Sequence, residues 1–183
     1  MAKRGYLKRH RIVRNAIKED FLYFAIPAIL IFTAGLVVSA WDGYEGLVSK
    51  ILELVRQPGL FRLLTAGNLI GLALFVFGMT IALVAVGTLR LNYHSTLVIR
   101  ENHKLVTHGI YCYVRHPVYL GVIVAIIGIP VYASSLYGLL IMLTLIPVIL
   151  NRIRLEERFL TDEFGDAYLE YKATTKKLIP FIY

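Results

Sequence analysis

Long runs of apolar residues, none of them interrupted by a charged side chain, dominate the chain. They cover residues 21–40, 63–89 and 118–150. The first two are long enough to cross about 30 Å of hydrocarbon as single helices. The third would extend about 50 Å as one helix, which is too long for a single crossing. Because Gly128, Pro130 and Ser134-Ser135 interrupt this run near its middle, we predict a hairpin of two short helices at 118–150.

Two shorter helices are predicted where apolar and charged residues alternate at helical spacing. Residues 45–57 form the first, an amphipathic helix in the membrane interface, which Gly43 and Gly46 separate from the preceding span. The second continues from the hairpin into a helical tail at 151–183, and Gly165 ends its periodic part. The pattern therefore predicts an all-α integral membrane protein with about four transmembrane helices.

Composition and charge support this interpretation. The chain is 57% hydrophobic and 17% charged, whereas soluble domains are roughly 25% charged. Seven of its 20 basic residues lie within residues 1–18, which contain no acid, so the net charge of +8 belongs mainly to an arm at 1–20. A basic arm beside a transmembrane helix suits an anionic membrane surface, and we expect no nucleic-acid partner.

The charge pattern also predicts the orientation. Basic segments stay in the cytoplasm, which places the arm there. The loop 90–117 carries four basic residues against the single acid Glu101, and it is expected on the same side. Four crossings then leave both termini and this loop in the cytoplasm.

Two polar clusters at the inner membrane surface are the candidates for chemistry. One is the loop 100–121, which holds His103, His108 and His116. The other is the charged end of the last apolar helix, from Arg152 to Arg158. No histidine pair has the i, i+4 spacing of a helical zinc site, and no cysteine pair exists, so we predict no metal. The single cysteine, Cys112, is expected to be a bystander.

The two clusters together resemble the integral-membrane methyltransferases, which include isoprenylcysteine carboxyl methyltransferase and the phospholipid N-methyltransferases. The similarity covers roughly residues 100–181. The matching positions are His103-x-Leu105-Val106-x-x-Gly109-x-Tyr111-x-x-x-Arg115-His116-Pro117-x-Tyr119-x-Gly121, then Glu156-Glu157-x-x-Leu160-x-x-x-Phe164-Gly165-x-x-Tyr168-x-x-Tyr171, and Pro180. The apolar runs predict two transmembrane helices within residues 21–89, and the resemblance implies that residues 90–183 form the methyltransferase core.

The resemblance also implies S-adenosylmethionine as cofactor, with a site at the cytosolic face. Leu105 and Val106 would contact the adenine, Arg115 and His116 the carboxylate, and Glu156 and Glu157 the amino group. The full set of expected cofactor-binding residues is His103, Leu105, Val106, Gly109, Tyr111, Arg115, His116, Pro117, Tyr119, Gly121, Glu156 and Glu157.

The residues fit this chemistry independently. The methionine end of the cofactor is a zwitterion, so a desolvated pocket must supply one cation and one anion. Glu157 and Arg152 are the candidates for assisting catalysis. Arg152 would orient the carboxylate of an acceptor. A lipid or lipidated acceptor would explain why the enzyme lies in the membrane. Carboxylate, amine, phenol and thiol acceptors all remain open at this point.

Two other functions are compatible with the pattern. A sterol-reductase-type enzyme would bind a nicotinamide cofactor in a related membrane module. A non-enzymatic lipid-binding or transport protein would use the clusters to hold headgroups. The sequence does not fix the oligomeric state, the organelle, or whether the hairpin fully crosses the membrane.

Overall fold

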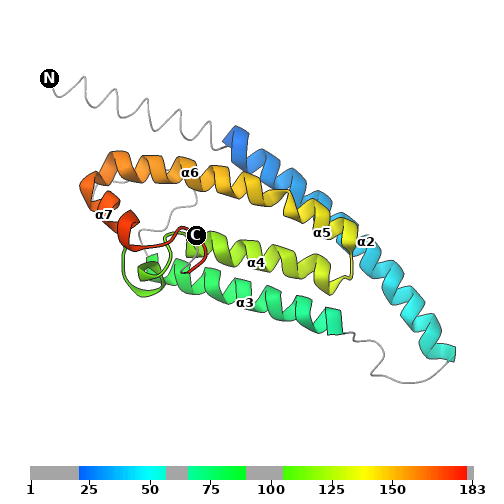
Figure 1. Ribbon diagram of the computed structural model, residues 1–183. Coiled ribbons are helices and arrows are strands. Elements are labelled where there is room, and N and C mark those ends of the chain that lie inside the picture. The colour runs from blue at the N-terminus through cyan, green and yellow to red at the C-terminus, as the bar shows by residue number, and fades with distance from the viewer. Residues whose placement is uncertain (1–20, 57–65, 90–104, 181–183) are drawn as a thin grey trace. The chain divides into compact units, whose positions relative to one another are not determined.

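Helices make up every regular element of the chain that the structure describes. The computed structural model describes residues 21–56, 66–89 and 105–180. The elements, in chain order, are η1 (Phe21–Ala25), α2 (Ile26–Arg56), α3 (Ala66–Leu89), η4 (Gly109–Cys112), α4 (Pro117–Tyr132), α5 (Leu136–Leu143), α6 (Leu145–Phe164) and α7 (Asp166–Thr174) (Figure 1). The all-α prediction is confirmed. The basic arm and His103 lie outside the described residues.

Three helical stretches are long and apolar enough to cross a membrane. They are Tyr23–Leu52, Ala66–Leu89 and Leu136–Phe164, with mean hydropathies of 2.1, 2.7 and 1.9. Large apolar side chains such as Leu30, Phe77 and Leu83 are exposed on these helices, as lipid contact requires. The remaining predicted membrane segment, α4, is the first arm of the hairpin. It has 16 residues and therefore a length of about 24 Å. The chain is an integral membrane protein.

One boundary differs from the sequence prediction. Residues 45–56 do not form a separate amphipathic helix, because they continue α2 without a break at Gly43 or Gly46. A glycine inside a helix costs about 1 kcal/mol relative to alanine, which weakens the helix without ending it. The helical hydrogen bonds therefore continue past both glycines, and the amphipathic residues form the end of α2.

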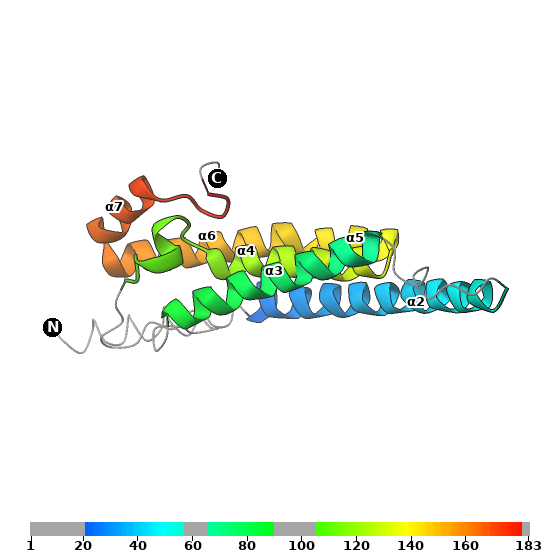
Figure 2. The same cartoon turned by 90° about the horizontal axis from the view of Figure 1, so that it is seen from below.

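Two compact units divide the chain. The bundle unit comprises residues 29–83 and 118–146, and the loop-and-tail unit comprises residues 1–28, 84–117 and 147–183. In the bundle unit, α3 and α4 lie side by side (Figure 2). A Cβ atom at Gly121 would come 2.5 Å from the carbonyl oxygen of Gly78, and one at Gly128 would come 2.6 Å from the amide nitrogen of Phe75. Glycines therefore allow the two backbones to approach closely.

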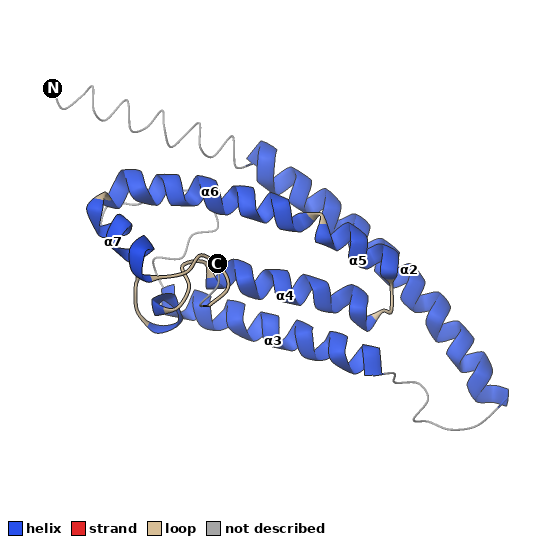
Figure 3. Cartoon of the chain, in the orientation of Figure 1, coloured by secondary structure: helices blue, strands red, loops and turns tan. Residues whose placement is uncertain are grey.

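The predicted hairpin is confirmed, and its turn lies at residues 133–135, between α4 and α5 (Figure 3). Ser135 caps α5, because its hydroxyl accepts a hydrogen bond from the amide of Gly138 at 2.9 Å. The same hydroxyl donates to the Asp42 carboxylate at 2.5 Å, which ties the turn to α2. Gly128 and Pro130 remain inside α4.

The loop-and-tail unit holds both polar clusters. Its helical tail follows the prediction: α6 runs to Phe164, Gly165 adopts a positive φ of 54°, and α7 begins at Asp166. A left-handed backbone favours glycine, so Gly165 can turn the chain sharply between the two helices.

Candidate functional site

Glu157, on α6, is the centre of the site. Its Oε1 atom accepts a hydrogen bond from Arg115 Nε at 3.0 Å, and His116 Nε2 lies 3.5 Å from the same oxygen. The side chains of Arg115 and Glu157 are 8% and 9% exposed, so the pair is largely removed from water. Arg115 and Glu157 are 42 residues apart in the chain, and the contact between the two polar clusters that the sequence predicts is found in the structure.

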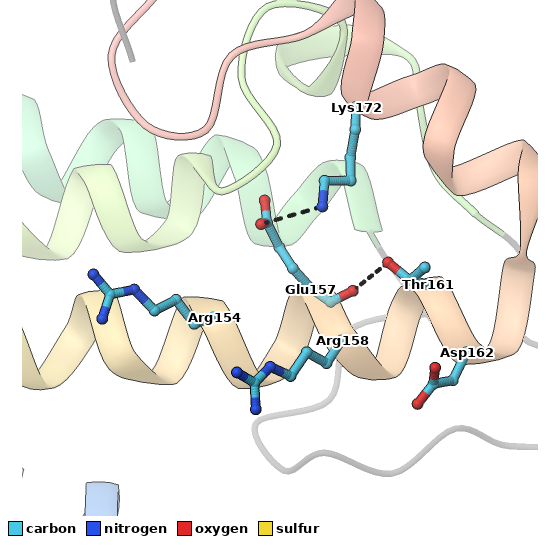
Figure 4. A pocket seen from close by; sticks show the side chains of 6 residues that line it. All are labelled: Arg154, Glu157, Arg158, Thr161, Asp162 and Lys172. Carbon is cyan, nitrogen blue, oxygen red and sulfur yellow. Dashed lines mark hydrogen bonds and ion pairs between the residues drawn. The ribbon is translucent and has the colours of Figure 1, made fainter.

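Two lysines of the tail surround the other carboxylate oxygen. Lys172 Nζ and Lys177 Nζ each lie 3.7 Å from Glu157 Oε2. Figure 4 shows Glu157 pointing toward Lys172, which reaches it from α7. Three permanent cations and one histidine therefore face a single carboxylate. This arrangement leaves the site with an excess of positive charge.

Backbone pairing holds Arg115 in place. Its amide donates to the carbonyl of Lys176 at 2.8 Å, beside the bridge between Val114 and Lys176. Its Nη1 atom donates to the carbonyl of Lys172 at 3.1 Å and also to the carbonyl of Thr175. A guanidinium is a rigid fork of donors, so these bonds fix its orientation toward Glu157.

Two tyrosines of α7 are buried close to the charged groups. The hydroxyl of Tyr171 donates to the carbonyl of Tyr111 at 2.7 Å, which joins α7 to η4. Burial raises the pKa of Tyr171 to about 12, so this hydroxyl stays protonated. Tyr168, one turn earlier, is fully buried.

Gly109 begins η4 and is required by its backbone conformation. Its φ is 64°, and a Cβ atom there would lie 3.1 Å from the Cγ2 atom of Thr88. Both strain and crowding therefore oppose a larger residue. The glycine sets the path of the loop that carries Tyr111 and Arg115.

A cavity of about 450 Å³ opens along α6 beside Glu157. This volume lies within the range of roughly 300–1,000 Å³ that is typical of small-molecule sites. Side chains of both charge signs line it, namely Arg154, Glu157, Arg158, Thr161, Asp162 and Lys172 (Figure 4). A ligand that carries both a positive and a negative group suits such a lining.

The other predicted site residues have varied surroundings. Leu105, Val106 and Glu156 are half-buried, whereas Tyr111 and Pro117 are buried. Arg152 is buried on α6, and its guanidinium carbon lies 5.5 Å from the centre of the Phe24 ring. Tyr119 and Gly121 belong to the bundle unit. The close contact of Gly121 with α3 explains this glycine without a cofactor.

Sequence reasoning missed the residues that the tail contributes. Lys172 and Lys177 were not among the expected site residues, and neither was Thr175, whose carbonyl binds Arg115. Lysines are common in polar segments of any kind, so no local pattern distinguishes Lys172 on α7 or Lys177 after it. Backbone carbonyls carry no sequence signal at all.

Comparison with known proteins gives consistent matches. Residues 70–162 match the isoprenylcysteine carboxyl methyltransferase (ICMT) family. Protein-S-isoprenylcysteine O-methyltransferase A of Arabidopsis thaliana is 30% identical over 139 residues, which are 74% of this chain and 70% of that protein. The corresponding Schizosaccharomyces pombe enzyme is 39% identical over 83 residues, covering 45% and 35% of the two chains.

A solved structure agrees with these matches. It is that of the eukaryotic intramembrane Ras methyltransferase ICMT, with a TM-score of 0.62 and 26% sequence identity. The match covers 80% of this chain and 52% of that one, so the chain spans about half the length of the solved protein. The chain therefore belongs to the isoprenylcysteine carboxyl methyltransferase (ICMT) family of methyltransferases.

Proposed function

We propose that the chain transfers a methyl group from S-adenosylmethionine to the carboxylate of an isoprenylated cysteine. The names of the related proteins support an isoprenylcysteine acceptor and an O-linked product. The excess of positive charge around Glu157 supports a carboxylate acceptor, because an anionic oxygen is attracted there.

The charged groups fit the proposed cofactor. Its methionine end needs a cation and an anion in a desolvated place, and Arg115 and Glu157 are both about nine-tenths buried. We assign the carboxylate to Arg115 and His116, and the amino group to Glu156 and Glu157. The other expected residues of the loop-and-tail unit, from His103 to Pro117, complete the proposed cofactor site.

The cofactor supplies an electrophilic methyl group on a sulfonium when bound. The chain's own residues then have three tasks. The buried side chains around Glu157 exclude water, which favours a reaction in which positive charge at sulfur disappears. Arg152 orients the acceptor carboxylate, since it is a buried cation on the same helix as Glu157. No general base is required, because a carboxylate acceptor is already deprotonated at neutral pH.

We also propose that the site and both termini lie in the cytoplasm. The seven basic residues within 1–18 support this, since basic segments flanking a transmembrane helix stay inside. An isoprenylated acceptor would approach from the bilayer, where its apolar chain already resides.

The proposal depends on the contacts of Arg115 and His116 with Glu157. A methyl-transfer assay tests it. Purified protein is incubated with labelled S-adenosylmethionine and three acceptors: a farnesylated cysteine with a free carboxylate, the same compound as its amide, and phosphatidylethanolamine. We expect label on the first compound alone. Label on the phospholipid instead would support an amine acceptor, and label on no acceptor would refute the proposal.

Variants separate the proposed roles. Glu156→Gln should weaken the binding of S-adenosylhomocysteine by about tenfold, or about 1.4 kcal/mol. Arg152→Ala should raise KM for the farnesylated cysteine and leave S-adenosylhomocysteine binding unchanged. Glu170→Gln is the matched control, because it makes the same change at an exposed position of α7. Equal effects from Glu156→Gln and Glu170→Gln would contradict the assignment of Glu156.

A further inference from the structure

The hydroxyl of Tyr168 is buried without a hydrogen-bond partner in the described part of the chain. The whole residue is 0% exposed. A buried donor that lacks a partner is costly, and each such group in a native protein calls for an explanation. The neighbouring Tyr171 makes a useful contrast, since its hydroxyl has a partner in the carbonyl of Tyr111.

Tyr168 contacts a residue that lines the cavity. The ammonium of Lys172, which lines the cavity, is 5.9 Å from the centre of the Tyr168 ring. The Lys172 side chain is 35% exposed, so this long, flexible group can move aside and let a ligand reach the hydroxyl.

Electrostatics define the kind of atom that the hydroxyl would meet. Burial raises the pKa of Tyr168, and the negative charge of Glu157 raises it further. The hydroxyl therefore stays protonated and is available as a donor. Because Arg115, Lys172 and Lys177 together exceed the charge of Glu157, an anionic oxygen is favoured in this region.

We propose that Tyr168 is a ligand-binding residue of this site, and that its hydroxyl donates a hydrogen bond to a carboxylate oxygen of the bound ligand. The inference rests on the proposed function. Two ligands of that function carry a carboxylate: the methionine end of the cofactor and the prenylated cysteine. Either could place an oxygen at Tyr168, and the experiment distinguishes them.

Two phenylalanine substitutions three residues apart on α7 make a matched pair. Tyr168→Phe removes a donor that has no partner among residues 21–56, 66–89 and 105–180, so the apparent melting temperature should stay the same or rise. Tyr171→Phe removes a buried hydrogen bond and leaves the carbonyl of Tyr111 without it, so the melting temperature should fall by about 2–4 °C.

Ligand binding is then measured for the wild type and for Tyr168→Phe. If the cofactor supplies the carboxylate, the variant should bind S-adenosylhomocysteine about tenfold more weakly, since bonds to charged groups are the stronger ones. A decarboxylated analogue should then bind both proteins equally. If the acceptor supplies it, S-adenosylhomocysteine binding should be unchanged and KM for the farnesylated cysteine should rise about tenfold.

Two results would overturn the inference. One is a variant that matches the wild type in S-adenosylhomocysteine affinity and in KM, with the proposed function left standing. The other is a lowered melting temperature with unchanged affinities, which would mean that the hydroxyl serves the folded chain through a resident water. A wild-type protein that does not bind S-adenosylhomocysteine would refute the proposed function and this inference together.

Discussion

At the scale of single residues, one carboxylate organises the site. Glu157 receives Arg115 and His116 from the loop before α4, and Lys172 and Lys177 from the tail. A buried carboxylate surrounded by cations joins segments that are distant in the sequence, and it also neutralises charges that would otherwise repel one another. The proposed ligand-binding role therefore falls on a side chain that also joins distant segments of the chain.

Glu157→Gln tests both roles, because it removes the charge and keeps the shape. The buried Arg115 would lose its counter-charge, so we expect the free energy of unfolding to fall by about 3 kcal/mol. S-adenosylhomocysteine should bind at least tenfold more weakly. Thermal unfolding in detergent and ligand titration measure the two effects. The exposed control Glu170→Gln should change stability by less than about 0.5 kcal/mol. Equal behaviour of the two variants would show that Glu157 does not organise the site.

At the scale of helices, the contact between α3 and α4 depends on paired glycines. Gly71 and Gly78 lie on α3, and Gly121 and Gly128 lie on α4. In each helix the two are seven residues apart, which is two turns and therefore one face. Gly71 and Gly78 both meet backbone atoms of α4 along this contact.

Gly78→Ala should separate α3 from α4. Its Cβ atom would collide with the amide nitrogen of Ala125 and come 2.5 Å from the carbonyl of Gly121, and backbone atoms cannot move aside cheaply. We expect a loss of about 1–3 kcal/mol in the free energy of unfolding. Gly87→Ala on the same helix meets nothing within 4 Å and should be neutral or slightly stabilising. Melting curves of the two variants decide the point, and similar losses in both would argue against the glycine contact.

At the scale of the whole molecule, the proposed orientation in the membrane can be tested with a single side chain. Cys112 is the single cysteine of the chain, it is exposed, and it lies in η4 within the loop that carries Arg115. Chemical labelling of Cys112 therefore reports the side of the membrane on which the site lies.

A membrane-impermeant maleimide should label Cys112 in inverted vesicles and leave it unlabelled in intact cells, if the site is cytoplasmic. Labelling is read by the mass shift of the purified protein, and Cys112→Ser is the control that should never be labelled. The reverse pattern, with label only in intact cells, would place the loop outside and contradict the proposed orientation.

The sequence by itself determined the membrane fold and the family. An uncharged run in hydrocarbon must be a helix, because a helix is the structure in which a single segment makes all of its own backbone hydrogen bonds. The hairpin at 118–150, the helix end at Gly165 and the methyltransferase family are all confirmed. The prediction of a separate amphipathic helix was wrong, because a glycine weakens a helix locally without ending it. The cofactor-binding role of each site residue stays a prediction.

Only the tertiary structure decided how the polar clusters come together. The approach of Lys172 and Lys177 to Glu157, and the capture of Arg115 by carbonyls of the tail, depend on contacts between distant segments. Local patterns report the surroundings of a residue along its own helix or strand. They do not report which backbone atoms another segment brings within reach. Only the placement of those atoms shows that the Tyr168 hydroxyl is buried without a partner among the described segments.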